Sequence, residues 1–161
     1  MGAQELSTRL WQERELLDLL VFKLEEEQLL LTSGKTRWLP FATREVEQVL
    51  ERLRVAGVDR TVEVAALAVE WGLPDDATLR QLIAGAPSSA WAEAFRGHLQ
   101  ALTDLTAQIT ALRDSNLQYL RAASRSTQET LARLDAESGT YDASGEASSA
   151  PAVARLFESD L

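Results

Sequence analysis

The fold is decided by residues 88–136, which read SSAWAEAFRGHLQALTDLTAQITALRDSNLQYLRAASRSTQETLARLDA. Mostly apolar residues recur along this stretch at alternating steps of four and three, which is typical of a long helix packed lengthwise against other helices. At about 1.5 Å per residue the helix would be on the order of 70 Å long, so it must protrude or lie beside equally long partners. This seam consists of Trp91, Phe95, His98, Leu102, Leu105, Ile109, Leu112, Asn116, Tyr119 and Ala123.

The seam weakens after Ala123, where serine, arginine and threonine replace most apolar residues. The apolar residues that remain are expected on a neighbouring face of the helix. We interpret the first half of the helix as an intramolecular packing surface and the second half as a surface kept for a partner. The predicted partner-binding residues are Leu117, Leu120, Ala123, Thr127, Leu131 and Leu134.

The composition predicts an all-α protein. The chain has 161 residues, 45% of them hydrophobic, which is enough for one domain with a real core. Only 6% are aromatic, and no convincing run of alternating β-branched residues indicates a strand. We expect an elongated antiparallel helical hairpin or bundle over residues 1–137, ending in the long heptad helix, and a flexible tail over residues 138–161.

Four shorter helices are predicted before the long one. Leucine periodicity predicts a helix over residues 4–32, which Ser33 and Gly34 end. A second is expected over 38–55, with Pro40 in its first turn. It either folds back as an antiparallel hairpin, which we favour, or continues the first helix with a kink. Short helices over 60–71 and 75–84, the latter capped by its aspartates, would connect to the long helix over 88–136.

The net charge of −9 narrows the classes of partner. Nucleic acids and anionic membrane surfaces both attract clustered basic residues, so neither is expected, and a protein partner is favoured. The chain has no cysteine, which excludes disulfides and Cys-type zinc sites. The N-terminus has no signal-peptide pattern, and no apolar run approaches the ~20 residues that span a bilayer. A cytoplasmic protein without membrane insertion is therefore expected.

No catalytic, cofactor or metal site is predicted, and an enzyme is not expected. The segment 33–36 ends like a phosphate-binding loop, but Leu29 stands where the first glycine belongs and a helix precedes it. His98 lies on the seam and is expected to be packed in the core. Glu25, Glu26 and Glu27 point in different directions around a helix, and a solvated face is expected.

Three further features leave a choice open. Asn116 on the seam could align the packed helices as a buried polar residue, or it could face solvent at the end of the core. Tyr141 stands alone in a Ser- and Gly-rich tail, which indicates a short linear motif. The four tryptophans are expected in the core near the helix junction, whereas an exposed one would indicate an interface; they are Trp11, Trp38, Trp71 and Trp91.

The order of three elements resembles the FlgN family of flagellar export chaperones, over roughly residues 5–145. The first is the leucine- and glutamate-rich helix that breaks at Ser33 and Gly34. The second is Asn116-Leu-Gln-Tyr-Leu120 in the long helix, similar to the family's Asn-x-x-Leu-Leu core, with Tyr119 in place of the first leucine. The third is Tyr141-Asp-Ala-Ser-Gly145, similar to the family's Tyr-x-Ala-x-Gly motif.

The resemblance implies a bacterial cytoplasmic chaperone. Such proteins bind the C-terminal helical region of hook-filament junction (hook-associated) proteins and prevent their premature assembly. They then deliver this cargo to the membrane protein of the flagellar type III export gate. Carried over to the matching position, Tyr141 would dock to the gate. We expect a monomer; the alternative is a self-associating coiled-coil scaffold without an export role, in which the seam closes between two chains.

Overall fold

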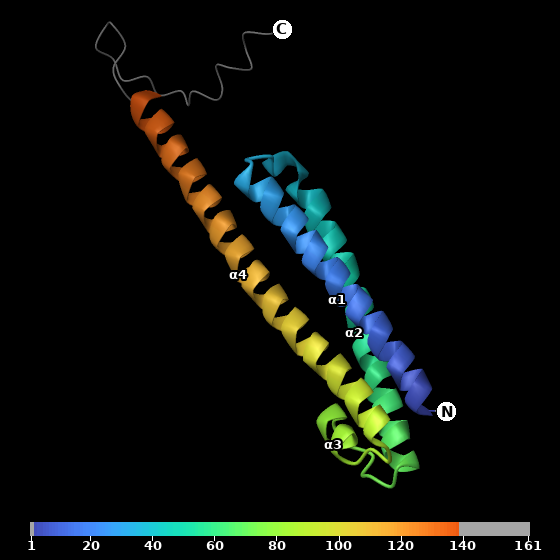
Figure 1. The fold of residues 1–161 in the computed structure, drawn as a ribbon. Helices are drawn as coiled ribbons and strands as arrows, with labels where there is room; N and C mark the ends of the chain where they lie inside the picture. Colours follow the sequence, from blue (N-terminus) through green and yellow to red (C-terminus); the bar gives the residue numbers. More distant parts are fainter. Residues whose placement is uncertain (1, 139–161) are drawn as a thin grey trace, which may run out of the picture. The chain divides into compact units, whose positions relative to one another are not determined.

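The computed structural model describes residues 2–138, which form helices joined by short turns and loops with no strand among them, and this confirms the all-α class (Figure 1). The elements are α1 (Gly2–Thr32), the 3₁₀ helix η1 (Thr36–Trp38), α2 (Leu39–Glu70), α3 (Leu79–Ala84) and α4 (Ser89–Ser138). The chain divides into two compact units, and the boundary falls within α4, between Leu117 and Gln118. No helix of the described part is both long and apolar enough to cross a bilayer.

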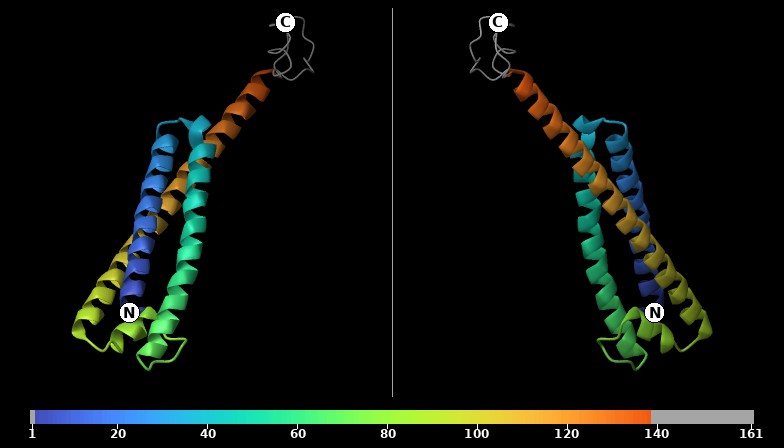
Figure 2. Two further views of the ribbon diagram at one scale, coloured as in Figure 1. Left: turned by 90° about the vertical axis from the view of Figure 1, so that its right-hand side faces the viewer. Right: turned by 90° about the vertical axis from the view of Figure 1, so that its left-hand side faces the viewer.

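Helices α1 and α2 form an antiparallel hairpin and lie side by side in both views (Figures 1 and 2). Lys23 pairs with Glu45 at 2.6 Å and Glu13 pairs with Arg60 at 2.7 Å, so partner numbers rise on one helix as they fall on the other. Gly34 allows the turn because its φ of 72° lies in the left-handed region that glycine adopts without a Cβ clash. The hairpin prediction is confirmed, and the kinked alternative is wrong.

Helix α2 is one helix of 32 residues where two, over 38–55 and 60–71, were expected. Gly57 lies in its interior with a helical backbone. A lone interior glycine costs only about 1 kcal/mol, and the buried side chains of Val64 and Leu67 pack into the core beyond it. The helix ends where Gly72 adopts a φ of 72° and the Leu73 amide donates to the Ala68 carbonyl at 2.8 Å.

Helix α3 is shorter than the predicted 75–84 and is capped differently. Its N-cap is Thr78, whose hydroxyl accepts from the Gln81 amide, while the Gln81 side chain accepts from the Thr78 amide at 2.7 Å. This reciprocal capping box, and not the aspartates, starts the helix. Leu82 is fully buried and fixes α3 to the core.

Two apolar clusters hold the unit that ends at Leu117. The first joins the start of α1, the end of α2, α3 and the start of α4, and it includes the fully buried Leu6, Leu67, Leu82 and Phe95. The second joins α1 and α2 nearer their connecting turn. It contains Leu20, Leu24, Val46 and Val49, with Ile109 and Leu112 of α4 packed against it.

The four tryptophans divide into two pairs. Trp71 and Trp91 pack against the first cluster, and both rings contact Phe95. Trp11 and Trp38 are exposed, at 53% and 44%, so the expectation of a core position is wrong for these two. Both instead carry an arginine guanidinium over the ring, at 4.2 and 4.7 Å from the ring centroid.

Candidate functional site

The first half of α4 packs along the hairpin, and its seam is buried or half-buried as far as Asn116, whereas the last two residues of the predicted seam, Tyr119 and Ala123, are exposed. Ser88 starts the helix by accepting a hydrogen bond from the Trp91 amide at 3.3 Å. Phe95 is fully buried and Leu102 nearly so. The last buried residue of α4 is Asn116, within the residues that the structure describes.

Asn116 joins three helices through a polar network. Its Nδ2 donates to the Leu24 carbonyl at 2.9 Å and to Glu27 Oε2 at 3.1 Å, both on α1. Glu27 Oε1 accepts from Thr43 Oγ1 of α2 at 3.0 Å. Of the two interpretations left open, the buried aligning residue is therefore correct. Glu27 is itself buried, so the predicted solvated face is wrong for this glutamate, although Glu25 is exposed.

Every described residue of α4 from Leu117 to Glu137 is exposed. All six predicted partner-binding residues fall in this segment, and its leucines keep large exposed fractions: 43% for Leu117, 39% for Leu120 and 53% for both Leu131 and Leu134. We call the six residues the α4 stripe; they are Leu117, Leu120, Ala123, Thr127, Leu131 and Leu134.

Helical periodicity allows the sequence spacing of the stripe to be compared with that of the seam. Eighteen residues make about five turns of an α-helix, so residues separated by this number project from the same side. Leu120 follows Leu102 by eighteen residues, and Leu134 follows Asn116 by the same interval. The stripe leucines therefore share the sequence spacing of the seam, although Ser124 and Thr127 interrupt it, and the last buried residue described on α4 is Asn116.

A groove that the sequence spacing did not predict lies within the first unit, between α2, residues 75–80 and α4. It has a volume of about 1020 Å³. Five threonines line it: the Thr78 hydroxyl lies 3.1 Å from Gln81 Oε1, and the other four hydroxyls donate to the carbonyl four residues earlier in their own helix, so these four donors need no partner from a ligand. They are Thr61, Thr103, Thr106 and Thr110. The sequence signal for this groove is the series of small residues at steps of three and four beside the α4 seam, Thr103, Thr106, Ala107 and Thr110.

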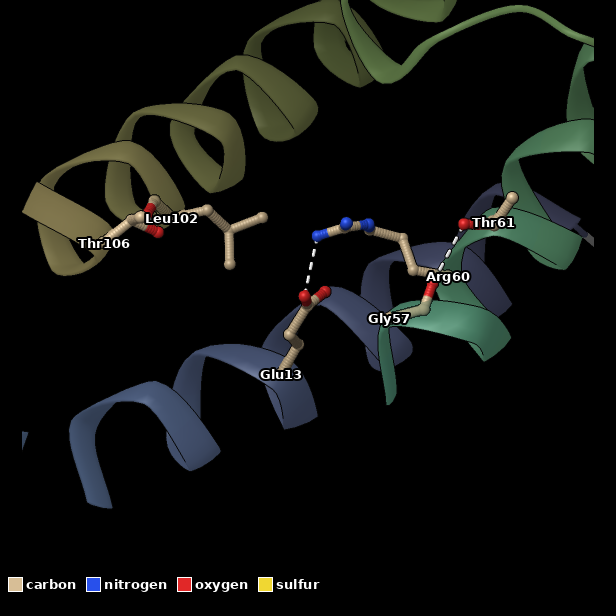
Figure 3. Close-up of polar contacts among 6 residues, drawn as sticks. All are labelled: Glu13, Gly57, Arg60, Thr61, Leu102 and Thr106. Carbon is tan, nitrogen blue, oxygen red and sulfur yellow. Dashed lines mark hydrogen bonds and ion pairs between the residues drawn. The ribbon is translucent and has the colours of Figure 1, made fainter. Parts of the chain in front are cut away.

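The ion pair between the buried Glu13 and the half-buried Arg60 lies beside the groove (Figure 3). The Arg60 side chain points from α2 toward Glu13, and the Leu102 side chain points toward the same pair (Figure 3). Burial raises the pKa of the Glu13 carboxyl, while Arg60 opposes that rise. Glu13 Oε2 has no hydrogen-bond partner, so the pair fixes α1 against α2 through one oxygen.

His98 is packed in the core, as expected. Its Nε2 lies 3.2 Å from the Ser7 hydroxyl and its ring meets the Trp11 ring edge-on, with centroids 5.2 Å apart. Burial lowers the pKa of His98, and the charge of Arg14 lowers it further. Among residues 2–138 no three acidic, histidine or cysteine side chains gather where they could hold a metal.

Tyr141 and its motif lie outside the described residues. The comparisons with known proteins cover this part of the chain as well. The model of the family described as FlgN protein matches residues 1–149, which include both the α4 stripe and Tyr141. No curated protein and no solved structure matches the chain. Since the match covers most of the sequence, the chain belongs to the FlgN family, whose members are flagellar export chaperones and not enzymes.

Proposed function

We propose that this chaperone acts in the bacterial cytoplasm and binds the C-terminal helical region of hook-filament junction proteins on the α4 stripe. It keeps this cargo from assembling early and delivers it to the export gate. The observation that supports the stripe is the change along α4: the seam spacing persists beyond Asn116, while the side chains become exposed. An exposed apolar face of a helix is the surface that an amphipathic partner helix covers.

Burial of the stripe would supply affinity, and the polar residues at its edge would select the partner. Covering a leucine side chain contributes about 1.5–3 kcal/mol, so four leucines give a useful gross gain before the cost of association is subtracted. Arg121 and Arg125 are exposed and, with Gln118 and Ser124, line a hollow on the same segment. Guanidinium groups there would pair with carboxylates of the cargo and set its register.

The first test is calorimetric titration of the chain with the C-terminal segments of the hook-filament junction proteins of the same organism. Leu120→Glu/Leu131→Glu should weaken binding by about 100-fold or more, because two charges would have to be buried. The matched control is Val58→Glu/Val62→Glu, which changes two exposed apolar residues of α2, at 61% and 62%. Unaltered cargo affinity in the stripe variant, with the fold intact, would refute this assignment.

The groove of about 1020 Å³ is the competing location for the cargo helix. Thr103 lines it and is exposed, so Thr103→Trp fills the groove without entering the core. We expect this variant to bind cargo like the unchanged chain. Loss of binding in Thr103→Trp, with normal binding in the stripe variant, would move the cargo site to the groove.

The gate-docking role of Tyr141 is a separate part of the proposal. Tyr141→Ala should leave cargo affinity unchanged and reduce the amount of junction protein secreted, and Tyr141→Phe tests whether the hydroxyl matters. Cargo binding that falls as much as secretion would contradict a separate docking role.

The alternative function, a self-associating scaffold, uses the same exposed stripe. Light scattering after size exclusion separates the two, because a chaperone should be a monomer that shifts to a one-to-one complex with the cargo segment. A stable dimer that ignores these segments, and that Leu120→Glu/Leu131→Glu dissociates, would establish the scaffold.

A further inference from the structure

A second exposed surface lies at the turn that joins α1 to α2, far in sequence from the α4 stripe. We call it the hairpin-tip patch. Its centre is a continuous row of contacts between two arginines and two aromatic rings. The Arg37 guanidinium lies 4.7 Å from the Trp38 ring centroid, the Trp38 and Phe41 rings are 5.8 Å apart, and the Arg44 guanidinium lies 5.8 Å from the Phe41 ring. Leu29 and Lys35 complete the patch.

The apolar part of the patch is unusually exposed for its residue types. Trp38 is 44% exposed, Phe41 57% and Leu29 69%. None of the three belongs to either apolar cluster of the core. Tryptophan and arginine are the residues most enriched among the energetic centres of protein interfaces, and aromatic rings are costly to leave in water.

The hairpin-tip patch is positively charged, whereas the chain as a whole is negatively charged. Residues 28–44 contain Lys35, Arg37 and Arg44 and no acidic residue, whereas the whole chain carries −9. Ion pairs occur elsewhere in residues 2–138, but none of them involves these three cations. The patch thus combines unpaired positive charge with exposed rings.

We propose that the hairpin-tip patch is a docking surface for an acidic segment of a partner protein, one that places carboxylates beside an apolar side chain. A guanidinium stacked on a ring keeps its N–H fork free at the edge, and the fork matches a carboxylate with two parallel hydrogen bonds. The apolar side chain of the partner would cover Trp38 and Phe41. An anionic membrane is the weaker choice, because its extended surface would also face the rest of this acidic chain, whereas a short acidic segment contacts the patch alone.

The test uses the full chain and synthetic helical peptides of matched length, followed by fluorescence anisotropy. One peptide carries leucines at steps of three and four flanked by glutamates, the second has glutamines in their place, and the third has lysines. We expect the glutamate peptide to bind at least tenfold more tightly than the other two. Its affinity should fall as salt rises, because exposed charges are screened.

Charge reversal then locates the site. Arg37→Glu/Arg44→Glu should weaken binding of the glutamate peptide by tenfold or more, and Trp38→Ala/Phe41→Ala should do the same by removing the rings. The matched control is Arg52→Glu/Arg96→Glu, which reverses two exposed arginines of the same unit outside the patch. The control should bind the peptide unchanged, and all variants should keep the cargo affinity that the α4 stripe provides.

Two results would overturn the proposal. The first is equal affinity for the glutamate and glutamine peptides, or for the charge-reversed and unchanged chains. The second is binding to vesicles of phosphatidylglycerol and phosphatidylcholine that depends on Trp38 and Phe41 while the glutamate peptide does not bind, which would make the patch a membrane contact. Urea unfolding of each variant ensures that a loss of binding is not a loss of fold.

Discussion

The two halves of α4 share one pattern and have two environments. Before Leu117 the face that carries Phe95 and Leu102 is buried against the hairpin, whereas after it the face that carries Leu120 and Leu131 is exposed. Hydrophobic spacing therefore indicates which side of a helix has a partner but not whether that partner belongs to the same chain. Under the proposed function, this difference separates the part of α4 that maintains the fold from the part that would bind cargo.

The largest expected effect comes from replacing one large apolar side chain by alanine in each half of α4 and comparing the two losses of stability. Phe95→Ala should lower the free energy of unfolding by about 3–5 kcal/mol, because it leaves a cavity in the first cluster. Leu131→Ala, on the same face by helical periodicity, should change it by less than about 0.5 kcal/mol. Urea denaturation followed by circular dichroism measures both. A large loss of stability in Leu131→Ala would mean that the second half is packed in solution.

The boundary itself is tested at Asn116. Asn116→Ala removes the donor that reaches Glu27 and leaves the buried carboxylate with fewer partners, so it should cost about 1–3 kcal/mol. Gln118→Ala, two residues further and exposed, should cost less than about 0.5 kcal/mol. Equal effects from the two substitutions would contradict a boundary at this position.

The packed half should also respond to acid through His98. Its pKa is lowered by burial and by Arg14, so the folded state binds fewer protons than the unfolded state. Stability is then unaffected well above pH 6.5 and falls as the pH drops from 6.5 through the lowered pKa of the folded state.

The measurement for His98 is the free energy of unfolding at several pH values between 8 and 5, in the unchanged chain and in His98→Gln. The variant retains a polar group near Ser7 but cannot titrate, so it should lose less stability on acidification. Identical pH profiles would show that His98 does not contribute to the acid sensitivity. Carboxylates also influence it, among them Glu45, whose pKa is lowered.

The smallest expected effect is a gain in stability when Gly97 is replaced. It lies inside the packed half of α4 but is exposed, and a Cβ there would meet nothing within 4 Å. Gly97→Ala should therefore stabilise the protein by about 0.5–1 kcal/mol, through helix propensity alone. A decrease in stability would indicate a close neighbour in solution, and Gly57→Ala in α2, where the space is equally open, is the parallel measurement.

Much of the fold could be predicted, because helix periodicity is a local property. The spacing located the first helix, the seam of α4 and the core position of His98, and Ser33 with Gly34 located the hairpin turn. It failed at Gly57, where the pattern indicated a break. There the packing of Val64 and Leu67 outweighs the small cost of one glycine, and that gain depends on residues distant in sequence.

The sequence by itself determined the helical class, the apolar face of α4 and the order of elements that places the chain in the FlgN family. Only the tertiary structure decided where that face stops being buried, because the limit is set by Leu24 and Glu27 of α1 meeting Asn116 across the bundle. It alone also showed that Trp38 and Phe41 are exposed beside Arg37 and Arg44. Burial depends on contacts between segments that are far apart in the sequence, so the local sequence around a residue does not show whether that residue is buried.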